Sequence, residues 1–110
     1  MGAVRRGDLV TVALQGAYGK PRPALVVQSD LFADHPSVTV LPLTSDLRDT
    51  AIFRPTVEPS AANGLRRTSQ VMADKAVTVP RERVGAAFGR VEDATMVAVT
   101  RALAVFLGIA

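Results

Sequence analysis

The chain has 110 residues, a formal net charge of +3 at pH 7 and a hydrophobic content of 48%. This length suits one domain, residues 1–110, and leaves no room for a second. Because cysteine is absent and histidine occurs once, the sequence excludes a disulfide framework and predicts neither a metal site nor a cofactor. No apolar stretch is long enough for a signal peptide or a bilayer span, so we expect a cytoplasmic protein that does not enter a membrane.

The first half of the chain has the pattern of a β-sheet. Residues 9–14 are rich in β-branched side chains between two glycines and predict a strand. A second strand is expected over residues 23–28, since proline is tolerated at the first position of a strand. After a short helical turn over residues 31–33, the alternation of residues 37–43 predicts a third strand.

The second half continues with shorter strands and ends in a helix. We expect strands over residues 52–57, 68–72 and 76–79. From Glu92 onward the apolar period changes to three and four residues, which predicts an amphipathic helix that ends at Gly108. The apolar stripe of this helix, a core or dimer contact, consists of Met96, Val99, Leu103 and Phe106.

Strands first and one helix last indicate an α+β fold with a small, curled antiparallel sheet. We therefore predict an SH3-like antiparallel β-barrel with a C-terminal α-helix. A small core with few aromatic side chains would be helped by dimerisation, so a homodimer is expected.

The basic residues are eleven arginines and only two lysines, and the sequence pI is about 10.2. Arginine binds phosphate through two parallel hydrogen bonds and stacks on bases, so this composition suits a nucleic-acid ligand. An arginine-rich and alanine-rich chain is equally typical of a GC-rich genome. The positions of the arginines therefore have to separate the two interpretations.

Arg22 is the strongest candidate for a functional residue. It lies between Pro21 and Pro23, which restrict the backbone to extended conformations. Its side chain is therefore aimed with little conformational entropy left to lose when a ligand binds. Most arginines on loops are only solvated, but the two prolines and the strand that follows favour a function here.

A hydroxyl pair, Thr44 and Ser45, follows the third predicted strand. If the second and third strands are neighbours, Arg22 and this pair can face each other across one edge of the sheet. A guanidinium and a hydroxyl together suit a phosphate group. Because a Thr-Ser pair after a strand is also a common turn former, the hypothesis depends on the match with Arg22.

The order of these motifs resembles the MazF/PemK family of toxin ribonucleases of type II toxin–antitoxin systems, over nearly the whole chain. The shared segments are residues 6–10 (Arg-Gly-Asp-Leu-Val), Arg22-Pro23, Pro42-Leu43-Thr44-Ser45 and residues 106–109 (Phe-Leu-Gly-Ile). The resemblance implies an mRNA interferase, a metal-independent and sequence-specific endoribonuclease that cleaves single-stranded RNA by attack of the RNA 2′-hydroxyl. It also implies an acidic antitoxin as partner. Whether the RNA is mRNA, tRNA or rRNA stays open.

The resemblance assigns catalytic roles to three residues. Arg22 would lie in the catalytic pocket and neutralise the phosphate oxygens, and Thr44 would donate to the same oxygens. Asp74 is the remaining candidate for a base, although a lone aspartate between two strands is most often a turn residue. Some relatives have an arginine two residues before this aspartate, where the chain has Met72, so their Arg–Asp division of labour does not carry over.

Six further residues are candidates for RNA binding. Tyr18 lies on a glycine-flanked loop, where its ring can stack on a base. Arg66 and Arg67 form a basic pair after a predicted turn and can bind phosphates, with solvated loop charges as the ordinary alternative. Lys75 stands where many relatives have glutamine. The remaining two candidates are Lys20 and Ser45.

Two other function classes remain open. A CcdB-like, non-enzymatic poison of DNA gyrase would share the barrel and act through its C-terminal residues, and Leu107-Gly108-Ile109 is faintly similar to the tail of that family. An SH3-like barrel used purely as a binding module is the second alternative. The sequence contains no P-loop, no dinucleotide fingerprint and no paired carboxylates at glycosidase-like spacing, so nucleotide and sugar chemistries are not predicted.

Overall fold

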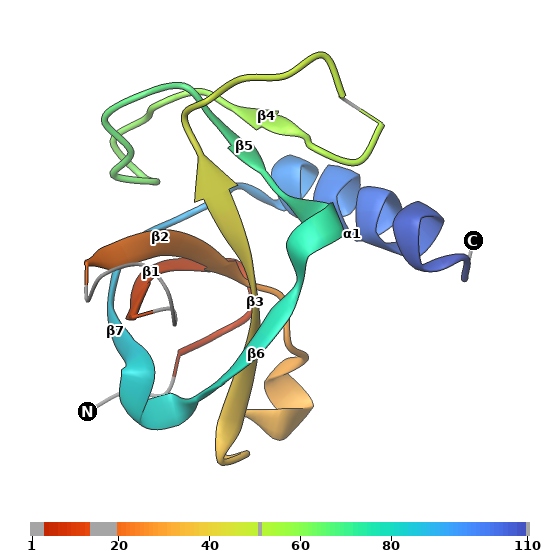
Figure 1. The fold of residues 1–110 in the computed structure, drawn as a ribbon. Coiled ribbons are helices and arrows are strands. Elements are labelled where there is room, and N and C mark those ends of the chain that lie inside the picture. The colour runs from red at the N-terminus through yellow and green to blue at the C-terminus, as the bar shows by residue number, and fades with distance from the viewer. Residues whose placement is uncertain (1–3, 14–19, 51, 110) are drawn as a thin grey trace.

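The computed structural model describes residues 4–13, 20–50 and 52–109, and it shows a curled antiparallel sheet with a C-terminal α-helix (Figure 1). The strands are β1 (Asp8–Ala13), β2 (Pro21–Val26), β3 (Ser37–Thr44), β4 (Thr56–Val57), β5 (Ser69–Val71), β6 (Val77–Pro80) and β7 (Val84–Arg90). The helical elements are α1 (Asp93–Leu107) and the short 3-10 turns η1 (Asp30–Phe32), η2 (Ala73–Lys75) and η3 (Arg81–Arg83). The predicted α+β class is confirmed.

β3 is the strand around which the sheet is organised. It pairs antiparallel with β2 from Val26–Val40 to Ala24–Pro42, and its other edge pairs first with β6 and then with β5. The strand order is β4-β5-β3-β2-β1-β7, with β6 beside β3. This sheet curls into a half-barrel that α1 covers on one side, so the predicted small barrel with a C-terminal helix is confirmed (Figure 1).

Alternation along the strands divides the core into two layers. Leu9, Leu25 and Leu41 are fully buried in a layer that also contains Val99 and Ala102 of α1. The even-numbered residues of the same strands fill the inside of the curl; they are Val10, Val12, Ala24, Val26, Val38 and Val40. Because side chains alternate between the two faces of a strand, the parity of a residue in β1, β2 or β3 indicates the face on which it lies.

Helix α1 ends as the sequence predicts. Gly108 has a φ of 75°, the left-handed conformation that glycine adopts without strain, and its N–H donates to the carbonyl of Val105 at 3.2 Å. The apolar stripe packs on the core except at Phe106, which is 50% exposed and whose ring centroid lies 5.9 Å from that of Phe53. Within the described part of the chain, no helix has the length and apolar character needed to cross a membrane.

β7 is the element that the sequence pattern does not indicate. It contains two glycines and shows no regular alternation of buried and exposed residues. It forms because β1 pairs with it along most of its length, with two register shifts. Gly89 is required for this arrangement, since a Cβ at that position would lie 2.1 Å from the carbonyl oxygen of Asn63. The strand therefore depends on contacts with distant parts of the chain rather than on its own composition.

The strand predicted over residues 52–57 is wrong for most of its length. Only Thr56–Val57 pair with β5, as β4 at the end of the sheet. The residues before them form a turn, because the N–H groups of Phe53 and Arg54 both donate to the carbonyl of Thr50. β-branched and aromatic residues were the basis of the prediction, and a local turn outweighs their preference here.

Candidate functional site

Arg22 and Thr44 lie at matching positions of neighbouring strands. The last pair of the β2–β3 ladder is Ala24–Pro42, and the same register continued by two residues sets Arg22 opposite Thr44. Both residues have even numbers, like the core residues of β1, β2 and β3 that fill the inside of the curl. Their side chains therefore belong to the sheet face opposite α1. Arg22 is exposed and Thr44 is half-buried. The two residues that the sequence selects first therefore belong to one face of the sheet, beyond the end of the β2–β3 ladder.

Prolines shape the end of β2 that carries Arg22. The strand begins at Pro21 and not at Pro23 as predicted, so Arg22 lies within β2 rather than before it. Proline has no N–H to donate, so Pro23 does not take part in the β2–β3 ladder. The ladder therefore ends at Ala24, the residue after Pro23. β1 supports this end instead, because Val12 pairs with Arg22. The arginine is therefore held in extended backbone at a place where β3 no longer pairs with β2.

The hydroxyl of Thr44 is oriented by the turn that follows β3. Its oxygen accepts a hydrogen bond of 3.0 Å from the N–H of Asp46. A hydroxyl that accepts on one side retains its proton for donation to another acceptor. A hydroxyl donor beside a guanidinium forms a site that suits an oxyanion, such as a phosphate oxygen.

Two polar residues beside the site are missed by the sequence analysis. Gln70 pairs with Thr44 across β3 and β5, is only 4% exposed, and holds the backbone of Arg48 with its amide. Arg48 in turn binds the carboxylate of Asp46. The available signal is a glutamine in the middle of a predicted strand, because a buried amide must find partners. Nothing in the sequence indicates which partners it finds.

Asp74 forms a two-point ion pair with Arg54. Arg54 Nε and Nη2 donate to Asp74 Oδ1 and Oδ2, each at 3.0 Å, and the two side chains are 14% and 15% exposed. The hydrogen bonds from Arg54 lower the pKa of Asp74 below its ordinary value of 3.8, although burial acts in the opposite direction. The same contact raises the pKa of Arg54. The carboxylate is therefore ionised near neutral pH and has a low proton affinity.

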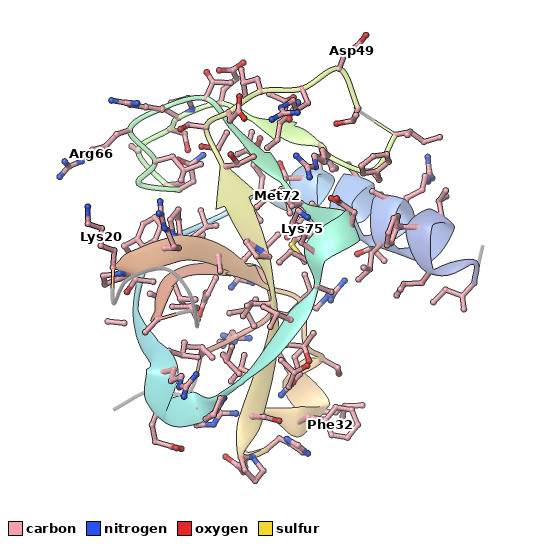
Figure 2. All side chains as sticks on the ribbon, viewed as in Figure 1. Lys20, Phe32, Asp49, Arg66, Met72 and Lys75 are labelled. Atoms are coloured by element: carbon pink, nitrogen blue, oxygen red, sulfur yellow. The ribbon has the colours of Figure 1, made fainter. Side chains whose placement is uncertain are left out.

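The strand order sets Asp74 apart from Arg22. β5 and the η2 turn that follows it lie across β3 from β2, and η2 contacts α1 (Figure 1). Lys75 belongs to the same turn and is exposed. Figure 2 shows Lys75 and Met72 near α1, whereas Lys20 lies at the far end of β2. The residues selected from the sequence thus form two groups, one around Arg22 and one around η2.

Arg66 and Arg67 lie on the loop between β4 and β5. Both are exposed, and Figure 2 shows Arg66 on the same side of the molecule as Lys20. The loop is held by Asn63, which is 4% exposed and whose side chain makes hydrogen bonds to three backbone groups of the loop. A buried asparagine with three hydrogen bonds gives the basic pair a defined support.

Ser45 and Tyr18 are the remaining candidates for RNA binding. Ser45 is exposed at the corner directly after β3. The prediction for Tyr18 falls outside the described residues. Among the residues that the structure describes, no group of three or more His, Asp or Glu side chains could hold a metal ion.

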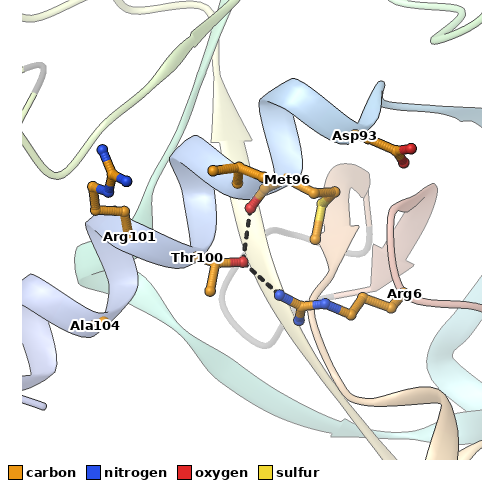
Figure 3. Close-up of a pocket in the computed structure, with 7 residues that line it drawn as sticks. Arg6, Asp93, Met96, Thr100, Arg101 and Ala104 are labelled. Atoms are coloured by element: carbon orange, nitrogen blue, oxygen red, sulfur yellow. Dashed lines mark hydrogen bonds between the residues drawn. The ribbon is translucent and has the colours of Figure 1, made fainter. Parts of the chain in front are cut away.

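A separate groove of about 570 Å³ runs along α1 (Figure 3). On one wall, the Arg6 guanidinium donates to the hydroxyl of Thr100, which donates in turn to the carbonyl of Met96. The lining residues are Arg6, Asp93, Met96, Val97, Thr100, Arg101 and Ala104. Because α1 covers the face opposite Arg22 and Thr44, this groove is distinct from their site.

Known proteins share both the sequence and the fold. Residues 5–107 match the family described as PemK-like, MazF-like toxin of type II toxin-antitoxin system. The probable endoribonuclease MazF of Mycolicibacterium smegmatis is 48% identical over 108 residues, which cover 97% of this chain and 99% of the relative. The structure of the Mycobacterium tuberculosis toxin MazF-mt6 has a TM-score of 0.80 at 26% identity, over 94% of this chain and 98% of that chain. For an endoribonuclease in complex with its cognate antitoxin from a mycobacterial species, the TM-score is 0.81 at 28% identity, over 98% of each chain. The chain therefore belongs to the family of PemK-like, MazF-like toxins of type II toxin–antitoxin systems.

Proposed function

We propose that this toxin is an endoribonuclease that cleaves single-stranded RNA. The observation that carries the proposal is the match of Arg22 with Thr44 on one sheet face, where β2 and β3 part. A permanently charged guanidinium and an oriented hydroxyl donor suit a scissile phosphate. The 48% identical relative is named a probable endoribonuclease, which supports the same activity.

The proposed reaction uses a nucleophile that RNA itself carries. The 2′-oxygen attacks the adjacent phosphorus and forms a 2′,3′-cyclic phosphate, while the bond between phosphorus and the 5′-oxygen breaks. The 2′-hydroxyl loses its proton and the departing 5′-oxygen gains one, so the step balances without water or a cofactor. Arg22 neutralises the charge that develops on the non-bridging oxygens, and Thr44 donates a hydrogen bond to one of them.

The proton transfers are the part of this mechanism for which the sequence offers Asp74. The pair with Arg54 keeps its carboxylate ionised and lowers its proton affinity, which weakens a general base. The strand order also places η2 across β3 from Arg22. Both observations favour a role of Asp74 in holding residues 45–55 in place, and its role as a base stays a prediction that the kcat of Asp74→Asn tests.

The partner of this toxin is proposed to be an acidic antitoxin that covers the RNA site. A similar endoribonuclease has been solved with its cognate antitoxin, which supports a toxin–antitoxin complex. Exposed basic side chains offer an acidic segment the same sites as RNA phosphates. The candidates are Lys20, Arg22, Arg66 and Arg67, with Ser45 after the end of β3, and Lys75 in the separate group around η2. RNA and antitoxin would then bind in competition, in the cytoplasm, where mRNA is translated.

Cleavage of a single-stranded RNA by the purified protein in the presence of EDTA tests the proposed activity. We expect cuts at preferred short sequences with 2′,3′-cyclic phosphate and 5′-hydroxyl ends, and no cuts after an equimolar amount of the cognate antitoxin is added. Intact RNA together with gyrase-dependent breaks in DNA would instead support a CcdB-like poison. The family match over residues 5–107 argues against that alternative and against a pure binding module.

A homodimer is proposed through α1 and the adjoining sheet edge. Five large apolar side chains on α1 and just after it are 47% to 77% exposed; they are Val97, Val105, Phe106, Leu107 and Ile109. Exposed apolar side chains gathered on one element are typical of an interface. Light scattering at micromolar concentration should give a dimer, and Val97→Glu should give a monomer. Leu31→Glu is the control, since Leu31 is 89% exposed on η1 and should leave the dimer intact; a monomeric wild-type protein would contradict the proposal.

A further inference from the structure

Gln70 directs both ends of its side-chain amide at the backbone of one residue. Its Oε1 accepts from the N–H of Arg48 at 3.0 Å, and its Nε2 donates to the carbonyl of Arg48 at 2.8 Å. Only one orientation of the amide satisfies both groups, since the reverse would set donor against donor. Arg48 lies outside the strands, so Gln70 supplies the two bonds that a neighbouring strand would otherwise provide.

Arg48 closes a ring of contacts that includes Thr44. Its Nη2 binds Asp46 Oδ2 at 2.9 Å, and the N–H of Asp46 donates to Thr44 Oγ1 at 3.0 Å. The ring is completed within the sheet, where Thr44 pairs with Gln70. The turn over residues 44–48 is therefore fastened at one end by the Thr44 hydroxyl and at the other by the Gln70 amide.

This ring lies on the sheet face that carries Arg22. Directly paired residues of an antiparallel sheet share a face, so Gln70 lies on the same face as Thr44, and Arg22 has the parity of that face on β2. Their sequence neighbours Leu43 and Val71 belong to the core layer that faces α1. Because Gln70 is only 4% exposed, it is not placed to contact RNA itself. It can influence the reaction only through the turn that it holds.

We propose that Gln70 is a positioning residue of the RNA site, which holds the 44–48 turn so that the Thr44 hydroxyl directs its proton at the phosphate. This inference rests on the proposed ribonuclease function. The Asp46 N–H donates to the Thr44 oxygen only while the turn keeps its shape. If Gln70 no longer holds Arg48, the turn loosens and the Thr44 hydroxyl can rotate away from the phosphate. Loss of this hydrogen bond destabilises the transition state, whereas RNA binding by exposed basic side chains is retained.

Steady-state cleavage of a short RNA by full-length Gln70→Met and Gln70→Glu tests the proposal. Methionine keeps the volume but lacks both polar atoms, so we expect kcat to fall about 10-fold to 100-fold while KM changes less than about 3-fold. An ionised glutamate accepts from the Arg48 N–H but repels the Arg48 carbonyl, whereas a protonated one restores both bonds. The activity of Gln70→Glu relative to wild type should therefore rise as the pH is lowered from about 8 to about 5.5, since burial raises the pKa of a carboxyl.

Gln28 provides the matched control within the same chain. It is half-buried and its amide also binds backbone, donating to the Ser37 carbonyl and accepting from the Thr39 N–H, but at the other end of β3. Gln28→Met should lose stability without losing kcat. An unchanged kcat in folded Gln70→Met, an equal loss of kcat in Gln28→Met, or a Gln70→Glu pH profile parallel to that of wild type would each overturn the proposal.

Amide hydrogen exchange separates this inference from the proposed function. In Gln70→Met, the N–H groups of Asp46 and Arg48 should exchange at least about tenfold faster than in wild type, while those of β1 keep their protection. Unchanged exchange at both positions would overturn the positioning role. A wild-type protein that cuts no RNA would contradict the proposed function instead, and the exchange rates would still decide whether Gln70 holds the turn.

Discussion

Replacing Arg22 by alanine should lower kcat/KM for RNA cleavage about 10²-fold to 10³-fold, the loss typical of removing one group that stabilises an oxyanion transition state. The residue is exposed on β2, so the melting temperature should stay within about 2 °C of wild type. Arg22→Lys keeps the charge but loses the bidentate hydrogen bonding. Its kcat/KM should therefore lie between those of Arg22→Ala and wild type. Rates are measured on purified protein, and growth after induction in a bacterium gives the cellular readout.

Arg5 offers a control of the same residue type. Its side chain is 70% exposed, and it precedes β1 at the end opposite Val12, the residue that pairs with Arg22. Arg5→Ala removes the same charge from the surface. We expect near-normal cleavage and growth arrest from this variant. If Arg22→Ala arrests growth as strongly as the parent at equal soluble expression, the assignment of Arg22 to the reaction fails.

Removing one partner of the Arg54–Asp74 pair should have the largest effect on stability. The pair is 14% and 15% exposed and doubly hydrogen-bonded, so an unpaired charge left behind is poorly solvated. We expect Arg54→Met to lower the free energy of unfolding by about 2 kcal/mol, and the melting temperature by about 8–10 °C. Thermal unfolding followed by circular dichroism at pH 7 measures both.

The exposed Asp46–Arg48 pair is the comparison for this effect. Its closest N–O distance is 2.9 Å, similar to the 3.0 Å of Arg54–Asp74, but its side chains are 71% and 64% exposed. A solvated pair contributes about 0–1 kcal/mol, so Asp46→Asn should shift the melting temperature by only a few degrees at most. Equal losses of stability in Asp46→Asn and Arg54→Met would contradict the idea that burial makes the Arg54–Asp74 pair more stabilising.

The contribution of Asp74 should also depend on pH. Its pKa is lowered in the folded protein by the hydrogen bonds from Arg54, so near pH 4 the unfolded chain binds more protons than the folded one. The stabilisation is therefore fully present above the ordinary carboxyl pKa of 3.8 and is lost as the pH falls through the lower folded value. The difference in stability between wild type and Asp74→Asn should accordingly shrink between about pH 5 and about pH 3.

The same Asp74 variant bears on the mechanism. If Asp74 only holds residues 45–55, Asp74→Asn should keep substantial cleavage activity below its reduced melting temperature, because an amide still accepts a hydrogen bond from Arg54. If Asp74 is the general base, kcat should fall about 10²-fold or more even where the variant is fully folded. The kcat of folded Asp74→Asn thus separates the two roles.

Features that depend on neighbouring residues could be predicted from the sequence. The prolines around Arg22, the alternation of residues 37–43 and the change of period after Glu92 are local properties, and they predicted β2, β3 and α1 to within a few residues. That Arg22 and Thr44 face each other across these strands stays a prediction, because the β2–β3 ladder ends at Ala24–Pro42. The order of the short motifs along the chain was sufficient to indicate the family.

The partners of distant polar groups, in contrast, depend on how the strands and loops are arranged in the folded chain. Gln70 binds Arg48 across 22 residues and Arg54 binds Asp74 across 20, and neither pair has a spacing that a helix or strand period would reveal. β7 forms although its composition disfavours a strand, because β1 supplies its pairing partners. Buried amides and charges must be satisfied wherever the folded chain brings partners within reach, and that is settled by the pairing of strands rather than by local preference.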